Sequence, residues 1–307
     1  MGTPAFALPS FEALVEAGHE VAAVVTQPDK PVGRGLENRP SPVKQAAEKR
    51  AIPALTPVKI HERGFVERLK SLKPDCIVVV AYGKILPEDA LGIPPLGCIN
   101  VHASLLPKYR GAAPVNRAII NGERETGVCT MLLDKGMDTG PVFLCESTPI
   151  GEDETFASLY ERLSKLGAAL LVKTLGLVEK GKITPSAQDE KKASYAPMLK
   201  KSDGLIDWAK DAVAIKNLVA GVCPWPGAFT HWNKKTLKIH TGGAAHWDNI
   251  PTDAMPGTVI LASNGRIIVK CGKGAFEMRE LQPENKNRMG ATDFLKGYRL
   301  KEGERFE

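Results

Sequence analysis

The sequence predicts a doubly wound α/β domain with a mostly parallel sheet, followed by a smaller β-barrel domain. Over residues 1–182, apolar segments of strand length alternate with segments of helical spacing, which is typical of strands covered by helices. Residues 76–81 are apolar and largely β-branched, as expected of a parallel strand buried on both faces. Beyond residue 202, short predicted strands separated by Gly, Asn and Pro turns favour a small barrel.

Hydrophobic periodicity places the individual elements. Phe65, Leu69 and Leu72 recur at helical spacing, for example, and predict a helix around them. On these grounds we expect helices over residues 9–17, 42–50, 61–72, 113–121, 155–180 and 212–220. We expect strands over residues 20–25, 52–55, 76–81, 126–133, 205–208, 236–240, 257–261 and 266–269, and a further strand that begins near residue 98. The Gly-x-Gly-x-x-Gly turn of dinucleotide-binding folds does not occur.

Composition indicates an ordinary globular protein of two domains. The chain has 307 residues, of which 43% are hydrophobic and 25% charged. No run of about 18 apolar residues occurs, so we expect no membrane span, and we expect no secretion signal. The six cysteines form no Cys-x-x-Cys pair, so we expect them to be reduced and buried in a cytoplasmic protein. A net charge of +6 suits a polyanionic partner but does not identify one.

Residues 100–114 contain the strongest candidate for a functional site. Asn100 and His102 are two apart on a predicted strand, so their side chains project to the same face. They also lie at the carboxyl end of that strand, where open α/β sheets bind their ligands. Asn offers a donor and an acceptor, and His exchanges a proton near neutral pH. The pair is therefore a candidate acyl-transfer site; the alternative is an ordinary polar turn.

The whole run Asn-Val-His-Ala-Ser-Leu-Leu-Pro-Lys-Tyr-Arg-Gly-Ala-Ala-Pro over residues 100–114 resembles the signature of the folate-dependent formyltransferases. A later loop, Asp-Lys-Gly-Met-Asp-Thr-Gly over residues 134–140, matches the family's Asp-x-Gly-x-Asp-x-Gly pattern, although a Gly-flanked Asp also forms simple turns. The resemblance implies 10-formyltetrahydrofolate as formyl donor and no metal. It implies that the catalytic residues are Asn100, His102 and Asp138. It implies that the formyl-folate site is lined by Ser104, Leu105, Leu106 and Pro107.

Two further segments resemble the branch of this family that formylates the methionine carried by initiator tRNA. We expect residues 26–44 to form a long loop without regular structure, because they are rich in Pro, Gly and basic residues. Within this loop, Arg34 matches an Arg that contacts tRNA in that branch of the family. A disordered surface loop is the alternative. Residues 223–228, Cys-Pro-Trp-Pro-Gly-Ala, resemble its OB-like tRNA-binding domain. Five lysines of this region either contact the phosphates of the tRNA or are solvated side chains at strand edges: Lys234, Lys235, Lys238, Lys270 and Lys273.

The resemblance leads to a domain assignment. We expect a catalytic domain over residues 1–182, a linker over residues 183–201 and a tRNA-binding barrel over residues 202–307. We expect the protein to act as a monomer on initiator Met-tRNA and not to associate with a membrane. In the family a first strand precedes Gly-Thr-Pro, here residues 2–4, so we expect the start to lie inside a longer coding sequence. Two alternatives stay open. One is a formyltransferase for glycinamide ribonucleotide or an amino sugar, and the other is a non-catalytic tRNA-binding protein.

Overall fold

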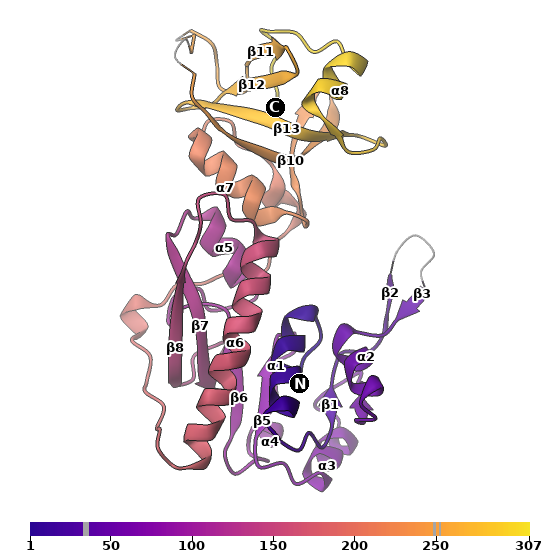
Figure 1. Cartoon of the computed structure of the whole chain (residues 1–307), viewed down its shortest axis with the longest axis vertical. Helices are drawn as coiled ribbons and strands as arrows, with labels where there is room; N and C mark the ends of the chain where they lie inside the picture. Colours follow the sequence, from indigo (N-terminus) through magenta and orange to yellow (C-terminus); the bar gives the residue numbers. More distant parts are fainter. Residues whose placement is uncertain (33–36, 248–249, 252) are drawn as a thin grey trace. The chain divides into compact units, whose positions relative to one another are not determined.

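The computed structural model describes residues 1–32, 37–247, 250–251 and 253–307 (Figure 1). The chain divides into two compact units, each described here by itself. Unit 1 consists of Met1–Pro114, Glu125–Pro149 and Tyr160–Pro197. Unit 2 consists of Val115–Arg124, Ile150–Leu159 and Met198–Glu307.

Unit 1 contains most of the alternating elements that the periodicity predicts. Its helical segments are η1 Ala5–Ala7, α1 Leu8–Glu16, α2 Pro42–Lys49, α3 Arg63–Ser71, α4 Glu88–Leu91, most of α6 Phe156–Glu179, and η2 Glu190–Lys192. Its strands are β1 Val24–Val25, β2 Lys30–Val32, β3 Glu37–Arg39, β4 Ala54–Leu55, β5 Ile77–Val80, β6 Cys98–His102, β7 Glu125–Leu132 and β8 Val142–Pro149. Helix α2 begins where the sequence predicts because Ser41 caps it, accepting a hydrogen bond from the Lys44 N–H, with Pro42 in the first turn.

The central sheet of unit 1 has the strand order β5-β6-β7-β8. Strands β5 and β6 run parallel, β1 pairs in parallel with β4, and Gly2 forms a parallel bridge to Val80. Strands β7 and β8 extend the sheet in the antiparallel sense. The predicted fold class, a mostly parallel α/β sheet followed by a smaller β domain, is confirmed.

Helix α6 covers one face of this sheet (Figure 1). A Cβ atom at Gly167 of α6 would lie 2.7 Å from Val101 of β6, so the glycine allows the helix backbone to approach the strand closely. Thr174 of α6 also shares a 2.8 Å hydrogen bond with Thr130 of β7. Because side chains alternate along a strand, Asn100 and His102 project from the opposite face of β6.

The loop over residues 26–44 contains regular structure that we did not expect. Strands β2 and β3 pair as an antiparallel hairpin, with Lys30 opposite Arg39. Thr26 and Ser41 join the two ends of the segment through a 2.7 Å hydrogen bond between their hydroxyls. Arg34 lies outside the described residues.

Unit 2 is built around an antiparallel sheet of order β11-β12-β13-β10-β9, with β14 added to β13. Its strands are β9 Ala228–Trp232, β10 Lys235–Ala245, β11 Val259–Ser263, β12 Arg266–Lys270, β13 Ala275–Pro283 and β14 Met289–Gly290. Its helical segments are most of α5 Pro114–Ile120, the start of α6, η3 Lys201–Gly204, α7 Ala212–Val222 and α8 Ala291–Gly297. The strand expected over residues 205–208 is wrong, since the only strand-like pairing there in the described residues is a single bridge between Leu205 and Phe229.

The C-terminal segment joins the two edges of this sheet. The Val259 N–H of β11 donates to the Glu304 carbonyl at 2.8 Å. At the other edge, His231 of β9 and Glu307 exchange a pair of backbone hydrogen bonds. Phe306 lies between these contacts and is buried, with its ring stacked on Trp208. The segment therefore closes the sheet into a barrel around the core of unit 2.

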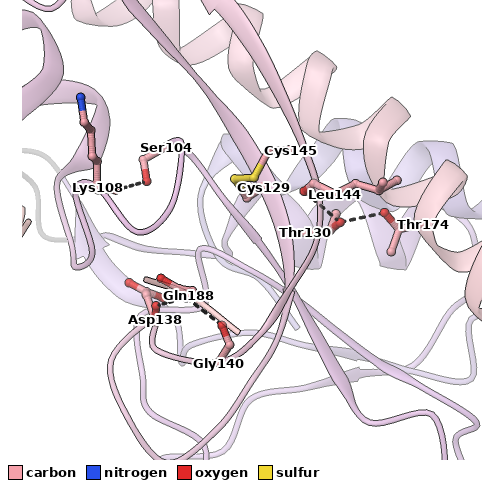
Figure 2. The surroundings of a disulfide bond; sticks show 10 residues. All are labelled: Ser104, Lys108, Cys129, Thr130, Asp138, Gly140, Leu144, Cys145, Thr174 and Gln188. Carbon is pink, nitrogen blue, oxygen red and sulfur yellow. Dashed lines mark hydrogen bonds between the residues drawn. A yellow bond between two sulfur atoms is a disulfide. The ribbon is translucent and has the colours of Figure 1, made fainter. Parts of the chain in front are cut away.

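The expectation that all six cysteines are reduced is wrong for two of them. Cys129 on β7 and Cys145 on β8 are directly paired in register, with Cα atoms 4.1 Å apart, and form a disulfide (Figure 2). Cys76, Cys98, Cys223 and Cys271 are free thiols. Burial raises the pKa of Cys98 to about 12, so that thiol stays protonated at neutral pH. The sequence did not show the disulfide because the pairing depends on the register of β7 and β8.

Candidate functional site

Strand β6 presents two polar side chains on the face that α6 leaves uncovered. Asn100 is 8% exposed and His102 is 6% exposed. Asn100 is opposite Met131 of β7, and His102 is opposite Cys129. Among the described residues, none forms a hydrogen bond with the Asn100 side chain. The site therefore contains a nearly buried amide whose donor and acceptor are both available to a bound molecule.

The loop over residues 103–113 follows β6 directly. Ser104 is buried, and its hydroxyl donates to the Lys108 carbonyl at 2.6 Å (Figure 2). Leu105 packs against β7 at Gly127, where a Cβ atom would lie 2.5 Å from the leucine side chain. The resemblance assigns residues 104–107 to folate binding. This segment therefore follows Asn100 and His102 almost directly in the chain. Its last three residues, Leu105, Leu106 and Pro107, are half-buried.

Asp138 is carried by the loop between β7 and β8. Asp134 holds the turn together, because its carboxylate accepts from the Gly136 N–H and from the Thr139 hydroxyl. At Gly140 a Cβ atom would lie only 1.8 Å from the Leu132 carbonyl oxygen, so only glycine fits there. Asp138 has a φ of 54°, in the left-handed region that non-glycine residues rarely adopt. The Asp-x-Gly-x-Asp-x-Gly pattern thus builds a tight turn that presents Asp138.

The structure brings His102 and Asp138 together. The His102 Nδ1 lies 3.5 Å from the Asp138 Oδ2, and the same carboxylate oxygen accepts a 2.8 Å hydrogen bond from the Gly111 N–H. The His102 Nε2 lies 3.0 Å from the carbonyl oxygen of Tyr109. A carbonyl can only accept, so Nε2 carries a proton. Nδ1 then faces a carboxylate, and this contact is attractive when a proton lies between the two groups. The pair can therefore store one proton next to the Asn100 amide.

Residues 186–196 form a segment beside the site that the sequence did not predict. We name them the strap: they run along the Asp138 loop and the loop over residues 103–113. Ser186 bridges to Val142, and Tyr195 bridges to Arg110. Gln188 donates from its side-chain amide to the carbonyl oxygens of Asp138 and Gly140 (Figure 2). A single Gln within a polar stretch carries no sequence signal for such a contact.

The other predicted contacts are spread more widely. Lys234, Lys235, Lys238 and Lys273 are exposed on unit 2. Lys270 is half-buried, and its ammonium donates to the Pro251 carbonyl. Within the described residues, no group of three or more His, Cys, Asp or Glu side chains is arranged to hold a metal ion. No helix in the described part of the chain is both long enough and apolar enough to cross a membrane.

Comparisons with known proteins agree with this architecture. A family model described as formyl transferase matches residues 1–175, and one described as formyl transferase, C-terminal domain, matches residues 198–299. A methionyl-tRNA formyltransferase of Citrifermentans bemidjiense is 52% identical over 303 residues, which are 99% of this chain and 94% of that protein. One of Caldanaerobacter subterraneus is 48% identical over 305 residues, or 99% and 97% of the two chains.

Solved structures show the same fold at lower identity. An N-formyltransferase of Helicobacter canadensis, crystallised with folinic acid and dTDP-3-aminofucose, has a TM-score of 0.65 and 18% identity over 92% of this chain and 97% of that one. The fold and the two matched models define a formyl transferase. At about half identity over nearly its whole length, the chain belongs to the methionyl-tRNA formyltransferases.

Proposed function

We propose that this protein transfers the formyl group of 10-formyltetrahydrofolate to the amino group of methionine on initiator tRNA. The main support for the proposal is the arrangement of the polar side chains at the end of β6. An unpartnered Asn100 amide lies two residues from His102, which contacts Asp138 at 3.5 Å. The matched relatives are methionyl-tRNA formyltransferases along nearly the entire chain, which supports charged tRNA as the acceptor.

In this proposal Asn100 stabilises negative charge. When an amine attacks a formyl carbon, the formyl oxygen becomes an oxyanion and needs donors that are already in place. The Asn100 side chain supplies an N–H that no described residue uses. Its burial strengthens that hydrogen bond, because water competes for it less than at an exposed site. Removing one such donor typically costs roughly 10²- to 10³-fold in rate.

His102 and Asp138 handle protons. The attacking amine must lose a proton, and the departing nitrogen of the folate must gain one. Both ring nitrogens of His102 face protein groups, so in this proposal the proton passes through the Asp138 carboxylate. The pair takes one proton from the attacking amine and returns one to the departing folate nitrogen. Acid–base catalysis of this kind contributes roughly 10² to 10⁴ in rate.

Folate binding is assigned to the loop that follows β6. Ser104, Leu105, Leu106 and Pro107 combine a hydroxyl with apolar surface beside Asn100, which fits the formyl-bearing end of a folate. The bound folate supplies the activated formyl group. The folinic acid in the Helicobacter canadensis relative supports a folate donor for this fold. We propose no metal in the reaction.

The acceptor is proposed to contact Arg34 and the exposed lysines of unit 2. We further propose that the protein acts as a monomer in the cytoplasm, where initiator tRNA is charged and used. The domain boundaries at residues 182 and 202 belong to the same proposal.

Substitution of the three side chains tests the mechanism. His102→Ala and Asp138→Ala should each lower the rate of a single turnover roughly 10²- to 10⁴-fold while folate affinity stays within about twofold. Asn100→Ala should lower it roughly 10²- to 10³-fold. Rapid-quench assays with charged initiator tRNA measure the rate, and fluorescence titration measures folate binding. Lys135→Gln, in the same loop as Asp138 but exposed, is the matched control. Wild-type rates in either His102→Ala or Asp138→Ala would refute the assigned roles.

A further inference from the structure

The strap contacts both groups that flank the His102 ring. Asp138, which faces Nδ1, accepts from Gln188 through its backbone carbonyl at 2.8 Å. Tyr109, whose carbonyl faces Nε2, donates its own N–H to the Ser194 hydroxyl at 2.9 Å. One continuous segment therefore holds the Asp138 loop and the Tyr109 carbonyl in place, although it follows β6 by more than 80 residues.

The orientation of Gln188 is determined by its partners. Its amide oxygen accepts from the Nε and one terminal nitrogen of Arg110, at 3.1 and 2.9 Å. An arginine can only donate, so the oxygen of the Gln188 amide must face it. The NH₂ group then points to the carbonyls of Asp138 and Gly140, at 2.8 and 2.7 Å (Figure 2). Both carbonyls can only accept, so all four hydrogen bonds are satisfied in this orientation alone.

Arg110 makes this arrangement rigid. Its side chain is 0% exposed, and it donates two parallel hydrogen bonds to the Glu190 carboxylate at 2.9 and 2.7 Å. The hydrogen bond with Glu190 raises the pKa of the Arg110 guanidinium, so the arginine remains charged. The guanidinium is planar and its N–H groups have fixed directions, so its contacts fix Gln188 and Glu190 relative to each other.

The Asp138 backbone needs such support. Its φ of 54° lies in the left-handed region, which residues other than glycine adopt less readily unless the surrounding structure holds them there. Gln188 bridges the carbonyls on either side of Thr139, and so holds the turn in the conformation that directs the Asp138 carboxylate toward His102.

From these contacts we infer that Gln188, clamped by Arg110, is a positioning residue that sets the Asp138–His102 contact during formyl transfer. The inference rests on the proposed function of that pair. Gln188 touches neither the imidazole nor the carboxylate of the pair; it acts through the backbone of the Asp138 loop.

Two substitutions of Gln188 test the inference. Gln188→Glu keeps the acceptor for Arg110 and removes both donors, and Gln188→Leu removes the donors without adding a charge. We expect kcat to fall roughly 10²-fold in both, because misplacing a catalytic group by about 1 Å has an effect of that size. KM for both substrates should change by less than about twofold, and the pH profile of kcat should shift, which a simple loss of stability would not cause. Asp189→Asn, the exposed neighbour on the strap, is the control and should retain wild-type kcat.

A double substitution separates positioning from a general structural role. In the Asp138→Ala background, Gln188→Glu should lower kcat by less than about threefold further, since the residue through which Gln188 acts is gone. The inference would be overturned if Gln188→Glu lowered kcat by a further factor of roughly 10² in that background, as it does alone. Wild-type kcat and pH profile in both single variants of Gln188 would overturn it as well.

An NMR measurement tests the positioning without catalysis. In protein with ¹⁵N-labelled histidine, the His102 imidazole signals are those absent from His102→Ala. We expect the His102 Nδ1 signal to move in Gln188→Glu and Gln188→Leu but not in Asp189→Asn. Unmoved signals in both Gln188 variants would overturn the inference. If the wild-type protein transfers no formyl group, the proposed function fails, and the NMR result still decides whether Gln188 positions the pair.

Discussion

His102 is held from both sides of its ring. The Tyr109 carbonyl fixes the proton on Nε2, and the Asp138 carboxylate faces Nδ1. Asn100 differs, because its side chain has no hydrogen-bonding partner in the described part of the chain. Two residues of one strand therefore have different roles in our proposal: His102 is oriented by the protein, and Asn100 is oriented toward the substrate.

Arg34 is the residue for which we predict an effect on the tRNA substrate alone. Arg34→Ala should lower kcat/KM for charged tRNA roughly 10- to 100-fold, the range expected when one specific arginine contact to nucleic acid is lost. KM for the folate should not change, since the formyl-folate site is assigned to another loop. Steady-state assays that vary each substrate in turn measure both quantities. Arg63→Ala, which removes an exposed Arg at the start of α3, is the control. Unchanged kcat/KM for charged tRNA in Arg34→Ala would remove this role.

The disulfide between β7 and β8 links the edge strand of the sheet to its neighbour. Cys129 is opposite both His102 and Cys145, and directly paired residues of antiparallel strands face the same side, so the bond lies on the His102 face. Cys129 is buried, whereas Cys145 is exposed on β8, so we expect a thiol reductant to attack the bond at Cys145.

Loss of this bond should loosen β7 and β8. A disulfide that closes a loop of this length contributes about 3 kcal/mol. Cys145→Ser, or reduction with dithiothreitol, should therefore speed amide exchange in residues 125–149 by up to roughly 10²-fold, as measured by hydrogen–deuterium exchange and mass spectrometry. Non-reducing peptide maps of the wild type should contain the Cys129–Cys145 link. Cys223→Ser, at a free cysteine of unit 2, should leave this exchange unchanged. Equal exchange in the oxidised and reduced proteins would contradict a stabilising role for the bond.

The elements that sequence analysis predicted are those with local patterns. Strand β5 is a run of Ile and Val, and α6 carries a helical repeat of Leu, so both were predicted within two residues of their observed ends. Strand β8 was missed because its second half, Glu146 to Pro149, is polar and partly exposed at the edge of the sheet. The β2–β3 hairpin was missed because Pro and Gly dominate its segment.

Contacts between distant segments could not be predicted from such patterns. Arg110 and Gln188 are 78 residues apart, and residues around Gln188 have the polar composition of a linker. We therefore predicted Asn100, His102 and Asp138 as candidate site residues, through a motif, but not the strap that supports them. We predicted an OB-like barrel for unit 2 from the family resemblance and from the turn residues between its short strands. Its closure by residues 303–307 could not be predicted, because it depends on hydrogen bonds to the distant strands β9 and β11.

At the scale of the whole molecule, the choice of acceptor separates our proposal from its alternatives. An enzyme that acts on glycinamide ribonucleotide or an amino sugar would use the same type of site as Asn100, His102 and Asp138. A non-catalytic protein would bind charged tRNA without modifying it. The relatives that are 52% and 48% identical over 99% of this chain are methionyl-tRNA formyltransferases, which favours charged tRNA as the acceptor.

The most direct test is therefore formyl transfer from 10-formyltetrahydrofolate to a panel of acceptors. The panel contains Met-charged initiator tRNA, free methionine, glycinamide ribonucleotide and an amino-sugar nucleotide. Our account predicts that only the charged tRNA is formylated, and that His102→Ala abolishes most of that activity. Formylation of one of the small acceptors in preference to the charged tRNA, or binding of the charged tRNA without any transfer, would contradict it.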